Sequence, residues 1–170
     1  MNTEMGEYIV GACLKLLMRC NVVDYNVRRP GGRLIGLNEL DVMGLDFNNR
    51  IAYLCEVTTH LDGLLYGSSS NSTMKRIRNK YHHMQEYADN YLSHFFTERH
   101  LMFWSPVVKP KARRELEDIK GLELIINDSY AECISRLQKF ARENTYDTGN
   151  PTMRVLQILG HLRREKATTS

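Results

Sequence analysis

The sequence predicts a single α/β domain in which a mixed β-sheet is flanked by helices. Its length of 170 residues suits one ordinary domain with a sizeable core. Its 42% apolar and 25% charged residues match the average of soluble globular proteins. An amphipathic helical pattern is followed by three strand-like segments and then by alternating helical and strand-like segments. That order is typical of a sheet with helices packed on it.

The first part of the chain predicts one helix and a meander. Apolar residues recur at spacings of three and four over residues 3–20, which indicates an amphipathic helix. Strand-like segments follow at 22–28, 34–45 and 51–59. Turn-forming residues at 29–32 and 46–49 separate them. The three strands are therefore expected to lie side by side.

The second part predicts a long helix and further alternating elements. A loop at 67–71 leads to an N-cap at Ser72 or Thr73 and to a helix reaching about residue 95. The apolar stripe of this helix consists of Met74, Ile77, Tyr81, Met84, Ala88 and Tyr91. The remaining elements are a strand at 100–108, a helix at 111–119, a strand at 122–126, and helices at 129–144 and 152–161. The domain is expected to span 1–162, with a short polar tail at 163–170.

Several protein classes are excluded by the composition. Glu4 and Glu7 stand where a signal peptide carries positive charge, and Lys15 interrupts the apolar run that follows. No apolar stretch approaches the roughly 18 residues that a membrane-spanning helix needs. The four cysteines form no CxxC pair, so neither a zinc site nor a disulfide framework is indicated. We expect a soluble, cytoplasmic protein with reduced thiols and no membrane partner.

Two short segments carry acids in a pattern that indicates a site. Because side chains alternate along a strand, Glu39 and Asp41 share one face, while Leu40 and Val42 point into the core. The same rule places Glu56, Thr58 and His60 on one face of the next strand. If the two strands form a hairpin, Asp41 and Glu56 become neighbours.

Paired carboxylates of this kind suit a metal ion. Together with the backbone carbonyl of Val57, Asp41 and Glu56 offer the hard oxygen ligands that Mg²⁺ prefers, and Mn²⁺ takes similar ones. Such an ion can activate water and stabilise the charge that develops on a phosphodiester. The alternative is that Glu39 and Asp41 form the solvated face of an antiparallel strand. Two observations favour the metal site. Like charges on adjacent strands would repel one another without a cation, and Glu56 interrupts an otherwise apolar strand.

These residues resemble the PD-(D/E)XK, or restriction-endonuclease-like, nuclease superfamily, and most of all its small resolvase-like and restriction-like members. In those proteins a Glu-x-Asp strand precedes a Glu-x-Lys strand, and the element order matches over roughly two-thirds of this chain, through Val108. The resemblance implies that Asp41 is the central metal ligand, Glu56 the second, and Glu39 an assisting group. Glu7 stands where many members carry another metal-site glutamate. It equally suits favourable interaction with the helix dipole.

The chain departs from the family at Thr58, where a lysine is expected. A threonine hydroxyl carries no charge, so another cation must substitute or the site is weakened. Lys75, Lys80 and His60 are the candidates. Lys75 and Lys80 lie on opposite flanks of the apolar stripe, so only one of them can serve. We prefer Lys75, whose flank also holds Arg78, His82, Gln85 and Asp89.

The start of the long helix is strongly basic although the whole chain has a formal net charge of only +3. Four positive side chains fall within six residues, and histidine follows. These residues could contact the phosphates of a nucleic acid, or they could form an ordinary solvated helix face. The candidate nucleic-acid contacts are Lys75, Arg76, Arg78, Lys80 and His82.

The sequence therefore predicts a Mg²⁺-dependent endonuclease that acts on DNA, with Asp41, Glu56, Thr58, Glu39 and Lys75 at its catalytic site. A nuclease-like protein that has lost catalysis, and that acts as a nucleic-acid-binding or assembly subunit, is the alternative that Thr58 motivates. A third interpretation is a protein-interaction domain whose acidic residues lie only on the surface and form no site. Cleavage of a duplex by so small a domain would favour a homodimer. The C-terminal helix, with Met153, Leu156, Ile158 and Leu159, could be either core or interface.

Overall fold

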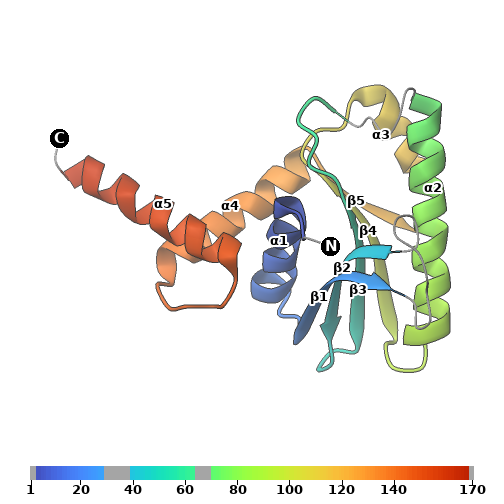
Figure 1. Ribbon diagram of the computed structural model, residues 1–170, viewed down its shortest axis with the longest axis horizontal. Helices are drawn as coiled ribbons and strands as arrows, with labels where there is room; N and C mark the ends of the chain where they lie inside the picture. Colours follow the sequence, from blue (N-terminus) through green and yellow to red (C-terminus); the bar gives the residue numbers. More distant parts are fainter. Residues whose placement is uncertain (1–2, 29–38, 64–69, 169–170) are drawn as a thin grey trace.

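The computed structural model describes residues 3–28, 39–63 and 70–168, and within them the chain forms an α/β domain (Figure 1). Five strands form one mixed sheet in the order β1-β2-β3-β4-β5. The first three strands pair antiparallel, as the predicted meander requires, and β4 and β5 continue the sheet in parallel. The strands are β1 (Val22–Arg28), β2 (Glu39–Asp46), β3 (Ile51–Val57), β4 (Glu98–Ser105) and β5 (Leu122–Ile126).

Helices cover both faces of this sheet, so the domain has three layers (Figure 1). One face carries α2 and α3, and the other carries α1, a π-helical continuation η1, and α4. Strand side chains alternate between the two apolar clusters: Leu54 and Phe103 join the α2 side, whereas Cys55 and Trp104 join the α1 side. The helices are α1 (Met5–Ala12), η1 (Cys13–Leu17), α2 (Ser70–Tyr87), its continuation η2 (Ala88–Leu92), α3 (Pro110–Glu117), α4 (Asp128–Glu143) and α5 (Pro151–Thr168).

A tight turn at Asp46 fixes the register between β2 and β3. Its Oδ1 accepts hydrogen bonds of 3.0 Å from the backbone N–H groups of Asn48 and Asn49, as aspartate commonly does in turns. The Asn49 side chain donates a further bond of 2.6 Å to Oδ2. Asp46 therefore pairs with Ile51, and all later pairs of the hairpin follow from this one.

Several boundaries differ from the sequence prediction; the strand predicted at 100–108, for example, is β4 (Glu98–Ser105). The long helix begins at Ser70, and its π-helical continuation η2 ends at Leu92. Leu92 is buried, whereas Tyr91, which was predicted to belong to the apolar stripe, is partly exposed. The last helix continues beyond its predicted end at 161 to Thr168, because arginine, glutamate, lysine and alanine are all good helix formers. The predicted strand residues 34–38 and loop residues 67–69 lie outside the described residues.

The C-terminal helix α5 packs on α4 and α1 and then projects from the domain (Figure 1). Met153 is fully buried and Leu156 packs on the α1-side cluster, so these two residues belong to the core. Ile158 and Leu159 are about half exposed. Among the described residues, no helix is both long enough and apolar enough to cross a membrane.

Close packing of α1 on β1 leads to the first prediction. A Cβ atom added at Gly11 would lie 2.0 Å from the Tyr25 hydroxyl oxygen and 2.6 Å from the ring carbon that bears it. Alanine normally favours a helix over glycine by about 1 kcal/mol. We expect Gly11→Ala to destabilise the protein instead, by about 1–3 kcal/mol, since the tyrosine ring must move. Chemical denaturation measures this difference.

Gly160→Ala is the matched control, because its Cβ would meet only the flexible side chain of Arg142, at 3.3 Å. This variant should keep its stability or gain slightly. A Gly11→Ala protein as stable as the wild type would contradict the packing of α1 against Tyr25.

Candidate functional site

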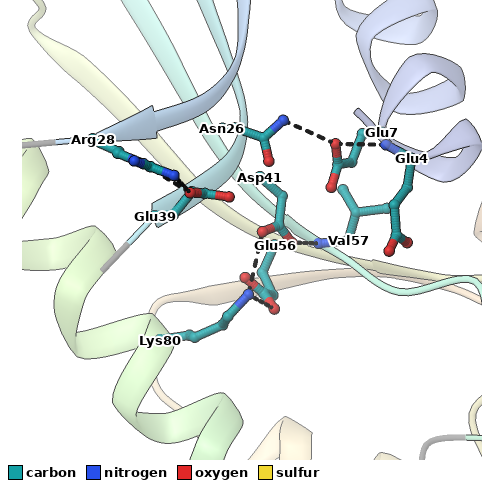
Figure 2. A network of polar contacts seen from close by, with 9 residues as sticks. All are labelled: Glu4, Glu7, Asn26, Arg28, Glu39, Asp41, Glu56, Val57 and Lys80. Atoms are coloured by element: carbon teal, nitrogen blue, oxygen red, sulfur yellow. Dashed lines mark hydrogen bonds and ion pairs between the residues drawn. The ribbon is translucent and has the colours of Figure 1, made fainter. Parts of the chain in front are cut away.

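Three side chains from three elements meet at one end of the sheet (Figure 2). Lys80 of α2 places its Nζ atom 3.2 Å from Oδ1 of Asp41 on β2, and 2.5 Å from Oε1 of Glu56 on β3. The side chains of Asp41 and Lys80 are each 12% exposed, and that of Glu56 is 3% exposed. The sequence prediction that Asp41 and Glu56 become neighbours is therefore confirmed, and an ammonium group lies between them.

The hairpin geometry explains why the two acids meet. Paired residues run from Asp46 and Ile51 at the turn to Val42 and Cys55, so Asp41 and Glu56 come next in the same register. The regular pairing of β2 with β3 ends at Val42 and Cys55. Beyond it, the Asp41 side chain connects the two strands, because its Oδ2 accepts a 2.8 Å hydrogen bond from the Val57 N–H. The carboxylate is thus held between the ends of two strands.

An unusual residue on β1 lies beside Asp41. Asn26 falls between two β1–β2 pairs and has φ +54°, a left-handed conformation that asparagine tolerates better than most residues. The alternation of β2 is broken at the same place: Leu40 packs on the α2 side and Val42 on the α1 side. The expectation that these two residues point to the same face was therefore wrong.

Glu7 reaches the site from the first turn of α1 (Figure 2). Its Oε2 accepts a 3.1 Å hydrogen bond from the Glu4 N–H at the helix start and a 3.5 Å contact from the Asn26 side chain. Burial raises the pKa of Glu7, and the negative charge of Asp41 raises this pKa further. Glu7 thus caps its helix and also lies within electrostatic reach of Asp41.

Glu39 has a different partner from the other acids. Its Oε2 lies 3.0 Å from both Nε and Nη2 of Arg28, the residue directly opposite on β1. Arg28 is the more exposed member, with 41% of its side chain accessible. The structure therefore places Glu39 in an ion pair at the sheet end, next to the group formed by Asp41, Glu56 and Lys80.

The protonation of Glu56 is strongly affected by its surroundings. Burial raises the pKa of Glu56 well above its ordinary value, and the charge of Asp41 acts in the same direction. Lys80 opposes this shift through its charge and its hydrogen bond. One ammonium therefore only partly compensates two nearly buried carboxylates, and the neutral form of Glu56 gains stability.

The lysine beside the acids is Lys80, whereas the sequence analysis preferred Lys75. Lys75 is exposed on α2, and the flank with Lys80 faces β2 and β3. The apolar stripe of the helix predicts which side is buried, but both flanks border it equally. His60, the other candidate, is exposed beyond the end of β3.

Thr58 occupies the position at which the resembled family has lysine. It is 5% exposed, and its backbone N–H donates a 3.0 Å bond to the carbonyl of Trp104. Its hydroxyl has no hydrogen-bond partner among the described residues. Thr58 therefore follows Glu56 by two residues without supplying a charge.

Exposed cations continue along the start of α2. Lys75, Arg76 and Arg78 are exposed, and His82 forms an exposed ion pair of 3.4 Å with Glu86. Lys80 was predicted to belong to this surface as well. Its near burial against Asp41 and Glu56 removes it from the exposed basic face.

The donor atoms of the site are hard oxygens. Across the described part of the chain, no three His, Cys, Asp or Glu side chains are grouped as a metal site. Asp41 and Glu56 nevertheless supply two carboxylates, and the Val57 carbonyl should share the edge of the strand from which its N–H reaches Asp41. Mg²⁺ commonly binds through one or two carboxylates and keeps several waters, so these residues fit it.

No protein-family model matches the chain, and no curated protein is similar to it in sequence. Its function is therefore inferred from the geometry of the site.

The raised pKa of Glu56 predicts how stability depends on pH in metal-free buffer. The folded protein keeps a proton on Glu56 at pH values at which the unfolded chain has lost it. This contribution to the free energy of unfolding is complete below the ordinary pKa of 4.5 and is lost as pH rises through the raised pKa. The melting temperature of the wild type should therefore fall as pH rises above 4.5. We expect this fall to be smaller in Glu56→Gln, with both proteins measured in the presence of EDTA.

Glu143→Gln, which changes an exposed glutamate of α4, should keep the wild-type pH dependence. Identical slopes for Glu56→Gln and the wild type would show that Glu56 is not protonated on folding.

Proposed function

We propose that the chain is a metal-dependent nuclease that hydrolyses phosphodiester bonds in DNA and has a restriction-endonuclease-like core. The observation that carries this proposal is the Lys80 ammonium between Asp41 and Glu56 at the open end of the hairpin. Two acids and one lysine are the groups that the resembled nucleases combine. Here the lysine comes from α2 and stands in for the uncharged Thr58.

The order and pairing of the elements support the same proposal. A helix, three antiparallel strands, a second helix and a parallel strand follow one another along the first two-thirds of the chain. The resemblance stated from sequence implies this order. The acids also lie on the second and third strands, as that resemblance requires.

In this proposal Asp41, Glu56 and the Val57 carbonyl would hold Mg²⁺ or Mn²⁺. When bound, the ion supplies an acidified water and compensates negative charge on the phosphate. Asp41 is oriented for this role by the Val57 N–H, and Glu56 by its place in β3. Glu7 and Glu39 would act from outside this pair, Glu7 by adding negative potential and Glu39 by fixing Arg28.

Lys80 would supply the positive charge that the site needs next to the scissile phosphate. An ammonium close to the scissile phosphate can orient the attacking water and stabilise the oxyanion of the transition state. The hydroxyl of Thr58 can do neither electrostatically, although it can donate a hydrogen bond.

The exposed cations of α2 would position the DNA. Lys75, Arg76 and Arg78 belong to the helix that carries Lys80, so a phosphate backbone bound along them would run toward the acids. Contacts of this kind fix position without reading sequence, and they weaken as salt concentration rises. DNA is therefore the proposed substrate, recognised through its backbone.

Cleavage assays test the proposal. Supercoiled, linear, single-stranded and branched DNA are incubated with Mg²⁺ or Mn²⁺, and the products are separated on gels. We expect cleavage by the wild type and a loss of roughly 100-fold or more in Asp41→Ala, Glu56→Ala and Lys80→Met. Lys139→Met, an exposed change on α4, should cleave like the wild type. DNA binding without cleavage on any substrate would instead favour a catalytically inactive binding subunit.

A lysine exchange tests whether Lys80 replaces the family lysine. The double variant Thr58→Lys with Lys80→Met moves the cation to the residue that follows β3, two positions after Glu56. We expect it to recover at least about tenfold of the cleavage rate lost in Lys80→Met. A double variant no more active than Lys80→Met, with an unchanged melting temperature, would contradict the equivalence of the two positions.

A further inference from the structure

We propose that Lys80 is a built-in counter-ion that a divalent cation must displace, so that occupation of the metal site releases the lysine toward the substrate. This inference rests on the proposed function and concerns the regulation of the same site. It follows from the position of one atom, Lys80 Nζ, relative to the carboxylates.

The Lys80 ammonium contacts the oxygens that a metal ion would use. Nζ lies 3.2 Å from Asp41 Oδ1 and 2.5 Å from Glu56 Oε1, so both acids direct an oxygen at the same cation (Figure 2). A metal ion coordinated by these oxygens would lie within a few ångströms of Nζ. Two cations so close repel strongly in a poorly solvated site, so Lys80 must move away when the metal binds.

Without a metal, the lysine stabilises the arrangement of the acids. The side chain of Glu56 is 3% exposed and that of Asp41 is 12% exposed, and two such carboxylates would repel one another if no cation lay between them. Removing one member of a buried ion pair leaves an uncompensated charge, which is strongly unfavourable. Lys80 thus keeps the metal-free site assembled.

The lysine can leave while the rest of the site stays in place. Its ammonium is attached through a flexible four-carbon chain, whereas α2 is anchored by the buried Ile77, Tyr81 and Met84. Asp41 is held separately by the Val57 N–H through its other oxygen, Oδ2. A rotation of the lysine side chain therefore frees the carboxylates without shifting either strand, and makes the ammonium available to a substrate phosphate.

Metal affinity measured without nucleic acid tests this exchange. Mn²⁺ is titrated calorimetrically into the wild type, Lys80→Met and Lys139→Met, which removes an exposed lysine from α4. We expect Lys80→Met to bind Mn²⁺ about tenfold more tightly or better than the wild type, because the competing cation is gone. Lys139→Met should bind like the wild type. Equal or weaker binding by a folded Lys80→Met would overturn the proposal.

A second measurement uses the wild-type chain and needs no variant to fold. Lysines are acetylated with an N-hydroxysuccinimide ester and quantified by mass spectrometry, with and without saturating Mn²⁺. Lys80 is 12% exposed and should react several-fold faster with metal present, whereas the exposed Lys75 should react at one rate in both conditions. An unchanged Lys80 rate at saturation would contradict its displacement.

The outcomes separate this inference from the proposed function. Metal binding by the wild type with no gain in Lys80→Met, or with no gain in Lys80 reactivity, overturns the exchange and leaves the proposed metal site intact. Absence of Mn²⁺ binding in the wild type and in a folded Lys80→Met overturns the metal site itself, and the exchange with it.

Discussion

The need to compensate two nearly buried carboxylates constrains this end of the molecule. Asp41 and Glu56 follow directly after the last pair of a hairpin, and both are withdrawn from solvent. Buried charge is costly unless it is paired and hydrogen-bonded. Lys80 supplies the pairing, and the Val57 N–H supplies a hydrogen bond. Even so, burial keeps the pKa of Glu56 raised, so the arrangement favours the protonated form of this side chain.

Much of the surrounding structure serves to place these three groups. The Asp46 turn sets the register that brings the acids opposite one another, and the irregular Asn26 lies beside Asp41 on the neighbouring strand. The α1 helix contributes Glu7, which joins its own helix start to Asn26. On the face of the sheet opposite α1, the apolar stripe of α2 packs into the core. This packing sets the position along the sheet at which Lys80 reaches the two acids. Site and fold are thus parts of one arrangement.

Local patterns in the sequence predicted most of the elements and the meeting of Asp41 with Glu56. Period-two alternation and the turn residues at 46–49 are sufficient for that prediction, since they determine face and register. They could not predict which lysine reaches the acids, because the flank of α2 that faces β2 depends on how the helix crosses the sheet. Asn26 and Arg28 also escaped notice: the first acts through a rare backbone conformation and the second through a cross-strand partner. Leu40 was misassigned because strict alternation fails beside Asn26.

In the proposed function, Lys80 of α2 would take the place of the lysine that the resembled restriction-endonuclease-like nucleases carry on the strand of the second acid. A sequence motif that requires lysine two residues after the second acid fails at Thr58, although a lysine is present in space. The most direct test is a crystal structure of the chain grown with Mn²⁺, using anomalous scattering to locate the metal. We expect an anomalous peak between the carboxylates of Asp41 and Glu56, within reach of the Val57 carbonyl, with Lys80 turned away. Crystals holding Mn²⁺ elsewhere, with Lys80 still between the two acids, would contradict the proposed metal site.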